Sequence, residues 1–517
     1  MKGDVKMRKS KSVIAVSLAA AMLASVVVET DLQPSTAQAA TTTKKSNKSK
    51  PPKMPNGKKT GTPPTKPGKG KKMGTPPTGK AGKGGPNTQS YDYKGKLKAT
   101  LNVKSGTKKI GKKTISNTKT DQNAALVQKN GKLVLSGTKL TKTGSSKSDD
   151  NANFYGLNSI LLANGKNAVA TVNNAILTSN ATGANGIFAT NKGTVNVTNT
   201  QIKTSGKANS RGLDATYGGK INANKVNIST QGDHSAAVAT DRGGGTVNVK
   251  NSKLTTKGSG SPLVYSTGTI SLNNVTGTAS GSQIAGMEGY NKISLKNSSL
   301  TSTSNKISGS DPIKNGVIIY QSTSGDAETS SSKSANFSAE NSTLKTKISS
   351  GAMFYVTNTT GKITLQNTNL KFDSNNVDLL RVVGNNSNNW GTKGKNGGHI
   401  TLTVKDQQLK GNIVVDTISS ANINLTNNST YTGKTQIVTN KYATSSSKSK
   451  TPLIMNIDNN SKWVVTGNST ITNLNLAKGG KIVDKDGKTV TIVANGKTVQ
   501  KGTSTYTVTV TGSFTNN

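Results

Sequence analysis

The segment Val195-Asn196-Val197-Thr198-Asn199-Thr200-Gln201-Ile202 carries a pattern that returns many times in this 517-residue chain. Two apolar residues lie two positions apart, an Asn follows after two more positions, and a third apolar residue comes three positions later. From Ala170 to Ile293 the first position recurs after 25, 26, 26, 23 and 23 residues. A repeat of about 20 to 50 residues indicates a solenoid of stacked coils. The first positions of the copies are Leu133, Ala170, Val195, Ile221, Val247, Ile270, Ile293, Phe337 and Ile363.

The pattern favours one kind of coil. Apolar residues at i and i+2 share one face of a strand, and Asn tolerates the left-handed backbone of a sharp bend. Gly137 and Lys225 occupy the Asn position in two copies, and Gly also suits a left-handed turn. The sequence therefore predicts an all-β fold, a right-handed parallel β-helix with an apolar interior. An antiparallel sandwich is the alternative, but it would not fix Asn at one phase of the repeat.

The first 39 residues resemble a secretory signal. Five basic residues precede the apolar run from Val13 to Val28, which is followed by Ala37-Gln38-Ala39, and a small-residue site of this kind is typical of cleavage. A retained anchor is the alternative, but the run is shorter than the roughly 20 residues that span a bilayer. No later apolar run is as long, so we expect no membrane-spanning segment in the mature chain.

Residues 40–90 have a different composition, with 13 Lys, no acidic residue and nine of the 13 Pro. Such a segment cannot bury enough apolar surface to fold, so we predict a disordered tether. Its charge suits contact with an anionic surface, and a plain soluble spacer is the alternative. Residues 91–480 are predicted to form the β-helix, with loops at 301–334 and 445–450, and residues 481–517 to form a cap of strands at its end.

The composition limits the chemistry. The chain has no Cys, so disulfides and thiolate metal sites are excluded. The formal net charge is +46, and much of it belongs to the predicted β-helix. Anionic polysaccharide, glycan or cell envelope is the expected partner. Nucleic acid is a weaker candidate, because aromatic residues make up only 4% of the chain.

The segment from Leu409 to Gly433, together with Asn460 to Leu474, resembles the last coils of bacterial autotransporter-adhesin passenger domains, the pertactin-like β-helices. The second segment reads Ser461-Lys462-Trp463 and then Thr466-Gly467-Asn468-Ser469 before Ile471 and Leu474. The resemblance implies a secreted, surface-associated bacterial protein, outside the cell. This chain departs from the family because no translocator β-barrel and no sortase-type motif follows the coils. Retention by other means is then implied, with the tether as the candidate.

An enzyme is the alternative function. Pectate lyases and related polysaccharide depolymerases also resemble this fold, and they use carboxylates and a basic residue on one outer face. The nearest candidates here are Asp214, Asp233, Asp241, Arg211 and Arg242. A 26-residue coil would place Asp214 beneath Thr240, with the carboxylates of Asp214 and Asp241 on opposite sides of their strand.

No catalytic, metal or cofactor-binding site is predicted from these residues. His234 and His399 have no metal-ligand spacing. The favoured function is a non-catalytic, adhesin-like protein that binds anionic polysaccharide or cell envelope through Lys-rich surfaces. A polysaccharide lyase or hydrolase remains the second reading, and the sequence does not decide whether the protein self-associates.

Overall fold

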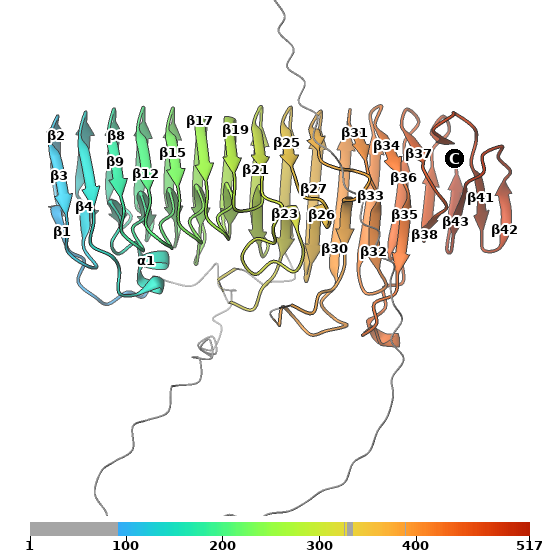
Figure 1. The fold of residues 1–517 in the computed structure, drawn as a ribbon, viewed down its shortest axis with the longest axis horizontal. Coiled ribbons are helices and arrows are strands. Elements are labelled where there is room, and N and C mark those ends of the chain that lie inside the picture. Colours follow the sequence, from blue (N-terminus) through green and yellow to red (C-terminus); the bar gives the residue numbers. More distant parts are fainter. Residues whose placement is uncertain (1–90, 325, 328–333, 388) are drawn as a thin grey trace, which may run out of the picture. The chain divides into compact units, whose positions relative to one another are not determined.

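The computed structural model describes residues 91–324, 326–327, 334–387 and 389–517. All of them belong to the second of two units in the chain, residues 72–517. The predicted signal at 1–39 and tether at 40–90 lie outside the described residues. Figure 1 shows that the described strands stack side by side in long rows, and the pairing within these rows is parallel. The prediction of a parallel β-helix is confirmed.

Each full coil contributes up to three strands. The first strand of each coil belongs to a 13-stranded parallel sheet, called sheet A here. Its members are β1 (Ala99–Val103), β4 (Asn123–Gln128), β7 (Leu161–Asn164), β10 (Ile187–Thr190), β13 (Leu213–Ala215), β16 (Val238–Thr240), β18 (Val264–Ser266), β20 (Ala285–Glu288), β23 (Asn315–Tyr320), β26 (Ala352–Thr357), β29 (Asp378–Val382), β32 (Ile413–Asp416) and β35 (Thr435–Val438).

The second strand of each coil forms row B. Its members are β2 (Thr107–Gly111), β5 (Lys132–Ser136), β8 (Val169–Asn173), β11 (Thr194–Thr198), β14 (Gly219–Asn224), β17 (Gly245–Thr256), β19 (Thr269–Ala279), β21 (Lys292–Lys296), β24 (Ala335–Glu340), β27 (Thr359–Gln366), β30 (Gly398–Lys405), β33 (Ser420–Thr426), β36 (Leu453–Ile457), β39 (Asn473–Leu476) and β44 (Phe514–Asn516). The recurring apolar pair of the sequence lies in this row.

The third strand forms row C, and β17 and β19 are long enough to run through both rows. The other members of row C are β3 (Thr114–Asn117), β6 (Lys139–Lys142), β9 (Ile176–Ser179), β12 (Gln201–Thr204), β15 (Asn227–Thr230), β22 (Ser299–Ser302), β25 (Thr343–Thr346) and β28 (Asn369–Lys371). Four later strands occupy the same place in their coils and form a separate sheet: β31 (Gln408–Lys410), β34 (Thr430–Gly433), β37 (Lys462–Val465) and β40 (Lys481–Asp484).

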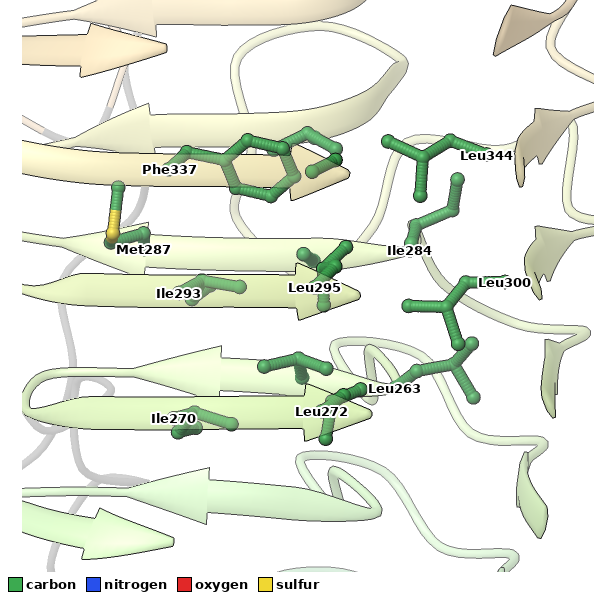
Figure 2. Close-up of a cluster of buried hydrophobic side chains, with 14 of the residues drawn as sticks. Leu263, Ile270, Leu272, Ile284, Met287, Ile293, Leu295, Leu300, Phe337 and Leu344 are labelled. Carbon is green, nitrogen blue, oxygen red and sulfur yellow. The ribbon is translucent and has the colours of Figure 1, made fainter. Parts of the chain in front are cut away.

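Apolar side chains stack in register inside the coils. Ile270 pairs with Ile293, and Ile293 pairs with Phe337 in the next coil. Figure 2 shows these side chains as a column, with Leu272 and Leu295 beside them. All five are at most 1% exposed, so each removes nearly its whole apolar surface from water. The interior is therefore continuous from coil to coil.

The bend between rows B and C has the predicted left-handed backbone. The φ angle is +47° at Asn199, +51° at Asn251 and +61° at Gly137. Lys225, in the Asn position of its coil, has a φ of +54°. Three pairs of side-chain amides link the Asn at this bend to the coil before it, including a bond of 2.8 Å from Asn274 Nδ2 to Asn251 Oδ1.

The residue after this bend points inward and often carries a hydroxyl. Ser252 Oγ accepts from the backbone N–H of Val226 at 3.0 Å, and Ser298 Oγ accepts from that of Val275 at 3.1 Å. Both serines are under 9% exposed. These hydroxyls satisfy backbone donors that the bend would otherwise leave buried without a partner.

Two interruptions of the repeat take different forms. Residues 301–334 were predicted as a loop, and this is wrong in part, because Asn315–Tyr320 is strand β23 of sheet A. Residues 445–450 do leave the coils, with a short 3-10 helix at Ser445–Ser447. The only α-helix of the described residues, α1 (Asp149–Tyr155), lies below the rows in Figure 1 with the longer loops.

The C-terminal end has its own small sheet. It contains β38 (Ser469–Ile471), β43 (Thr507–Val510), β41 (Thr491–Ala494) and β42 (Lys497–Gln500), and β41 and β42 form an antiparallel hairpin. The last strand, β44, returns to pair with β39. The proposed division at residue 480 stays a prediction. No helix in the part of the chain described above is long and apolar enough to span a membrane.

The strained bend at Lys225 yields a prediction. Asn adopts the left-handed region more readily than Lys does, so Lys225→Asn should raise the free energy of unfolding by about 1 kcal/mol. Chemical denaturation measures this change. Lys220→Asn is the matched control, since it removes the same charge from a neighbouring strand position without positive φ. A Lys225→Asn protein no more stable than the wild type would contradict this account of the bend.

Candidate functional site

Lysines and acids occupy different sheets of the described chain. The strands of rows B and C, including the four later strands, contain two acids, Glu340 and Asp484. Sheet A has no lysine in its strands but holds Asp214, Glu288, Asp378, Asp416 and Arg381. The lysines of rows B and C are Lys108, Lys109, Lys132, Lys139, Lys142, Lys203, Lys220, Lys250, Lys253, Lys292, Lys296, Lys345, Lys362, Lys371, Lys405, Lys410, Lys462 and Lys481. We call the outward surfaces of rows B and C the basic faces.

Lysines on the basic faces have few acidic partners. All of those named above except Lys142 are exposed, and among the described residues only Lys296 forms an ion pair, at 2.9 Å to Glu340. Lys345 and Lys371 lie directly opposite one another in register, as do Lys462 and Lys481. Like charges placed opposite one another destabilise a sheet. A bound polyanion would remove this repulsion.

A column of small polar side chains runs along the middle of row B. Asn222 Nδ2 donates to Asn196 Oδ1 at 2.9 Å, and Asn248 Nδ2 donates to Asn222 Oδ1 at 3.0 Å. We call this column the polar lane; its members are Thr171, Asn196, Asn222, Asn248, Ser271, Ser294, Ser338, Thr364, Thr403, Asn424, Asn456 and Asn475. It presents hydroxyl and amide groups beside the lysines.

Lysines recur beside the polar lane at intervals. The strand position two residues N-terminal to the polar lane carries a lysine in four coils: Lys132, Lys220, Lys292 and Lys362. The coils between them have neutral residues at this position. Since neighbouring coils are about 4.8 Å apart, these charges are roughly 10 to 15 Å apart along the stack. The basic face is thus a repeating pattern of charge and small polar groups.

A shallow groove follows the bend between rows B and C. It has a volume of about 670 Å³ and crosses four coils at Asn199, Lys225, Asn251 and Asn274. Lys253 lines it from row C. The left-handed bend therefore provides both the turn in the backbone and a concave surface with amide groups and two lysines.

The outer face of sheet A is covered over several coils. Helix α1 begins after its N-cap Ser148 and ends at Gly156, which has a φ of 72°. It is held to the coils by Asn185 Nδ2, which donates to Ala152 O at 3.0 Å, and by Thr216 Oγ1, which donates to Phe154 O at 2.8 Å. Farther along the stack, Trp390 stacks on Tyr320 with ring centroids 4.6 Å apart.

One buried ion cluster lies under α1. Arg211 Nη1 is 3.0 Å from Asp214 Oδ2, and Arg211 Nη2 is 2.9 Å from Asp241 Oδ2. All three residues are at most 8% exposed. Arg211 also donates to Asn153 Oδ1 of α1 at 3.0 Å. One guanidinium thus holds two carboxylates and the helix, which leaves the cluster with one more negative than positive charge.

The expected arrangement of Asp214 and Asp241 on opposite sides of the strand is wrong. Asp214 pairs with Ala239, not Thr240, so Asp241 is two positions away and its side chain lies on the same side. The coil is 25 residues long here and 26 at Ile221, because the turn into β17 has an extra residue. A uniform repeat could not reveal this difference.

The other candidate residues do not join this cluster. Arg242 Nε bonds Asp326 Oδ1 at 3.0 Å, and its guanidinium lies 3.8 Å from the centre of the Phe154 ring. Asp233 Oδ1 accepts from the backbone N–H of Ser259. His399 lies on row B, and its Nδ1 is 2.9 Å from Ser420 Oγ.

A partly open cavity of about 200 Å³ adjoins the cluster. Arg211, Asp241, His234, Tyr265 and Asp326 are among the residues that line it. Asp214 does not line it and is fully buried. Arg211 occupies the space between the two carboxylates, where a cation would otherwise bind. Across the described ranges, no three His, Asp or Glu side chains gather closely enough to hold a metal ion.

Burial changes the acidity of the cluster. It raises the pKa of Asp214 from 3.8 to about 6 and that of Asp241 well above 3.8, and Arg211 offsets only part of the effect. Arg242, Asp326 and Tyr265 act on the charges of the cluster, and His234, Asp311 and Tyr320 line the same cavity. Since the folded protein binds these protons more tightly than the unfolded chain, the stability that the cluster contributes is largest below about pH 4 and falls as pH rises through about 6.

This pH dependence yields a prediction. In Asp241→Asn, Arg211 pairs with Asp214 alone, so the pKa of Asp214 should fall and the loss of stability between pH 4 and 7 should shrink by about 1 to 3 kcal/mol. Denaturant unfolding across this pH range measures it. Asp486→Asn, at an exposed carboxyl far along the chain, is the control. If both variants kept the wild-type pH profile, the raised pKa values of Asp214 and Asp241 would not be the source of this pH dependence.

The sequence predicted Lys-rich surfaces but did not assign them to particular rows of strands. The repeat itself indicates that these lysines point outward, because Lys292 and Lys296 flank the inward pair Ile293 and Leu295. The cover over sheet A left no comparable signal, since α1 and the loops contact coils distant in sequence.

No protein-family model matches the chain, and no curated protein is significantly similar to it in sequence. The candidate surfaces therefore rest on the geometry and charge described above.

Proposed function

We propose that this protein is a non-catalytic, adhesin-like binding protein that holds an anionic polysaccharide across its basic faces. The observation that carries the proposal is the separation of charge between the sheets. Exposed lysines lie on rows B and C with almost no acidic partners, while the strand acids are concentrated in sheet A. A surface of one sign attracts polymers of the opposite sign over several ångströms.

Polysaccharide fits the basic faces better than nucleic acid does. The polar lane offers hydroxyl and amide groups that can exchange hydrogen bonds with sugar hydroxyls. Single-stranded nucleic acid is usually bound by stacking of bases on aromatic side chains. The outward strand positions of rows B and C that the structure describes contain no Phe, Tyr or Trp. Tyr431 and Trp463 in these strands point inward and are fully buried.

The proposed setting is the outside of a bacterial cell. The signal-like residues 1–39 support export, and the resemblance of the last coils to autotransporter-adhesin passenger domains supports display at the surface. In this proposal the cationic residues 40–90 hold the protein against the envelope while the basic faces bind polymer.

The salt dependence of binding tests the proposal. Polygalacturonate is the probe, and binding should weaken steeply as salt rises, because each lysine contact releases counterions. The triple variant Lys220→Gln, Lys292→Gln, Lys362→Gln should lower the slope of log K against log salt by about two to three. Surface plasmon resonance on immobilised polymer measures both.

The matched control is Lys306→Gln, Lys395→Gln, Lys448→Gln, which removes the same charge from exposed loop positions. It should change the slope much less. Equal slopes for the two variants would show that net charge alone governs binding, and salt-independent binding would contradict the electrostatic account.

A second candidate, a polysaccharide lyase or hydrolase, is favoured by one observation. The cavity of about 200 Å³ on sheet A is lined by the carboxylate of Asp241 and the guanidinium of Arg211, an acidic and a basic residue of the kinds expected for such enzymes. Incubation with polygalacturonate should then release new chain ends, and Asp241→Asn should abolish their release. If the wild type releases none over a panel of acidic and neutral polysaccharides, this candidate is excluded for those substrates.

A further inference from the structure

A groove of about 640 Å³ lies at the N-terminal end of the coils, on the side of sheet A. Its walls come from the segment that leads into β1, from the turn before β4 and from the ends of β1, β4 and β7. It is separate from the basic faces and from the Arg211 cluster, none of whose residues line it. Its volume far exceeds what a single small anion needs.

The groove is strongly cationic. Five lysines line it, and no acidic residue does: Lys96, Lys98, Lys104, Lys119 and Lys129. Asp92 and Asp121 are close in sequence to the lining segments but do not line the groove. Asp92 accepts from Tyr155 Oη at 2.5 Å, and Asp121 accepts from Ser146 Oγ at 3.0 Å. The lysines therefore lack neutralising carboxylates within the groove.

Four carboxamides line the groove between the lysines, and hydrogen bonds hold three of them, Asn102, Gln128 and Asn164. Gln128 Nε2 donates to Asn102 Oδ1 at 2.9 Å, and Asn164 Nδ2 donates to Tyr91 Oη at 2.8 Å. Asn164 is also held by Asn191, whose Nδ2 donates to its Oδ1 at 3.1 Å. These bonds fix the amides, so that ligand hydroxyl groups would meet donors and acceptors that are already oriented.

Two tyrosines complete the groove. Tyr91 and Tyr93 line it and are half-buried. The ring of Tyr91 packs edge-on against the rings of Tyr155 and Tyr217, with centroids 5.5 Å and 5.6 Å apart. The ring centroids of Tyr93 and Tyr155 are 5.1 Å apart. This packing holds the rings in place, and it leaves part of each available for contact with a ligand.

We propose that this groove is a binding site for a short acidic oligosaccharide, recognised by its carboxylates through the lysines and by its hydroxyls and ring faces through the amides and tyrosines. The inference rests on the proposed function for the class of ligand, but it places a separate site on a different face. A few sugar residues fill such a site, whereas binding along the basic faces depends on contacts repeated over many coils. Oligomer length therefore separates the two sites.

The test uses the full chain and tetragalacturonate, with affinity measured by isothermal titration calorimetry at low salt. The groove variant is Lys96→Gln, Lys104→Gln, Lys129→Gln, and the matched control is the loop variant Lys306→Gln, Lys395→Gln, Lys448→Gln, which lies outside the groove. All six lysines are exposed, and circular dichroism checks that both proteins keep the fold. We expect the groove variant to bind the tetramer at least tenfold more weakly and the control to stay within twofold of the wild type.

Equal losses in the two variants, or no binding of the tetramer by the wild type, would overturn the groove site. Full competition by inorganic phosphate at equal concentration, or tighter binding of a short single-stranded oligonucleotide, would also overturn the saccharide assignment. Failure of the proposed function is distinguishable from failure of the groove site. In that case the variant Lys220→Gln, Lys292→Gln, Lys362→Gln would bind polygalacturonate as the wild type does, while the groove variant would still bind tetragalacturonate more weakly.

Discussion

Parallel register between coils is the constraint on which the rest of this structure depends. Each strand pairs with the equivalent strand of the coil before and after it. Residues at the same position of successive coils therefore lie next to one another along the stack. At inward phases this repetition gives the column through Ile270, Ile293 and Phe337 (Figure 2). At the bend it favours a left-handed backbone in most coils, which Asn and Gly usually supply and Lys112, Lys225 and Asp406 supply in three of them.

The same register arranges the outer surface. An outward side chain has no part in the interior, but it still stacks on its equivalents about 4.8 Å away. Small hydroxyl and amide groups tolerate this, and in the polar lane they bond one another. Stacked lysines repel one another, and Lys345 and Lys371 lie directly opposite one another in register. In the proposed function, a bound polyanion supplies the missing opposite charge.

Sheet A has a different role from rows B and C. Its outward positions are covered by α1 and loops, and they hold the buried charges of Arg211, Asp214 and Asp241. Ion clusters of this kind cost desolvation energy and depend on well-placed partners. The molecule therefore separates a covered, partly acidic side from an open, basic one, and the lysine groove lies where the coils begin on the covered side.

How much of this the sequence predicts depends on the range of the interactions. The in-and-out alternation within a strand such as β11 and the left-handed turn at Asn199 depend on residues close in sequence, and they were predicted correctly. The parallel pairing of strands in successive coils follows from the repeat length. The pairing of Asp214 with Ala239 was missed, because one extra turn residue before β17 shifts the register of one sheet and not the other. Strand β23 was missed because the period breaks around it, and the cover formed by α1 depends on contacts such as that between Ala152 and Asn185. Nothing in the local pattern encodes those contacts.

The central claim is that an anionic polysaccharide lies along rows B and C. Lysine acetylation in the presence and absence of polygalacturonate, read by mass spectrometry, tests it most directly. The account predicts protection of Lys220, Lys292, Lys345 and Lys371, with Lys306 and Lys448 modified equally in both conditions. Equal protection of loop and strand lysines, or protection confined to the loops, would contradict it.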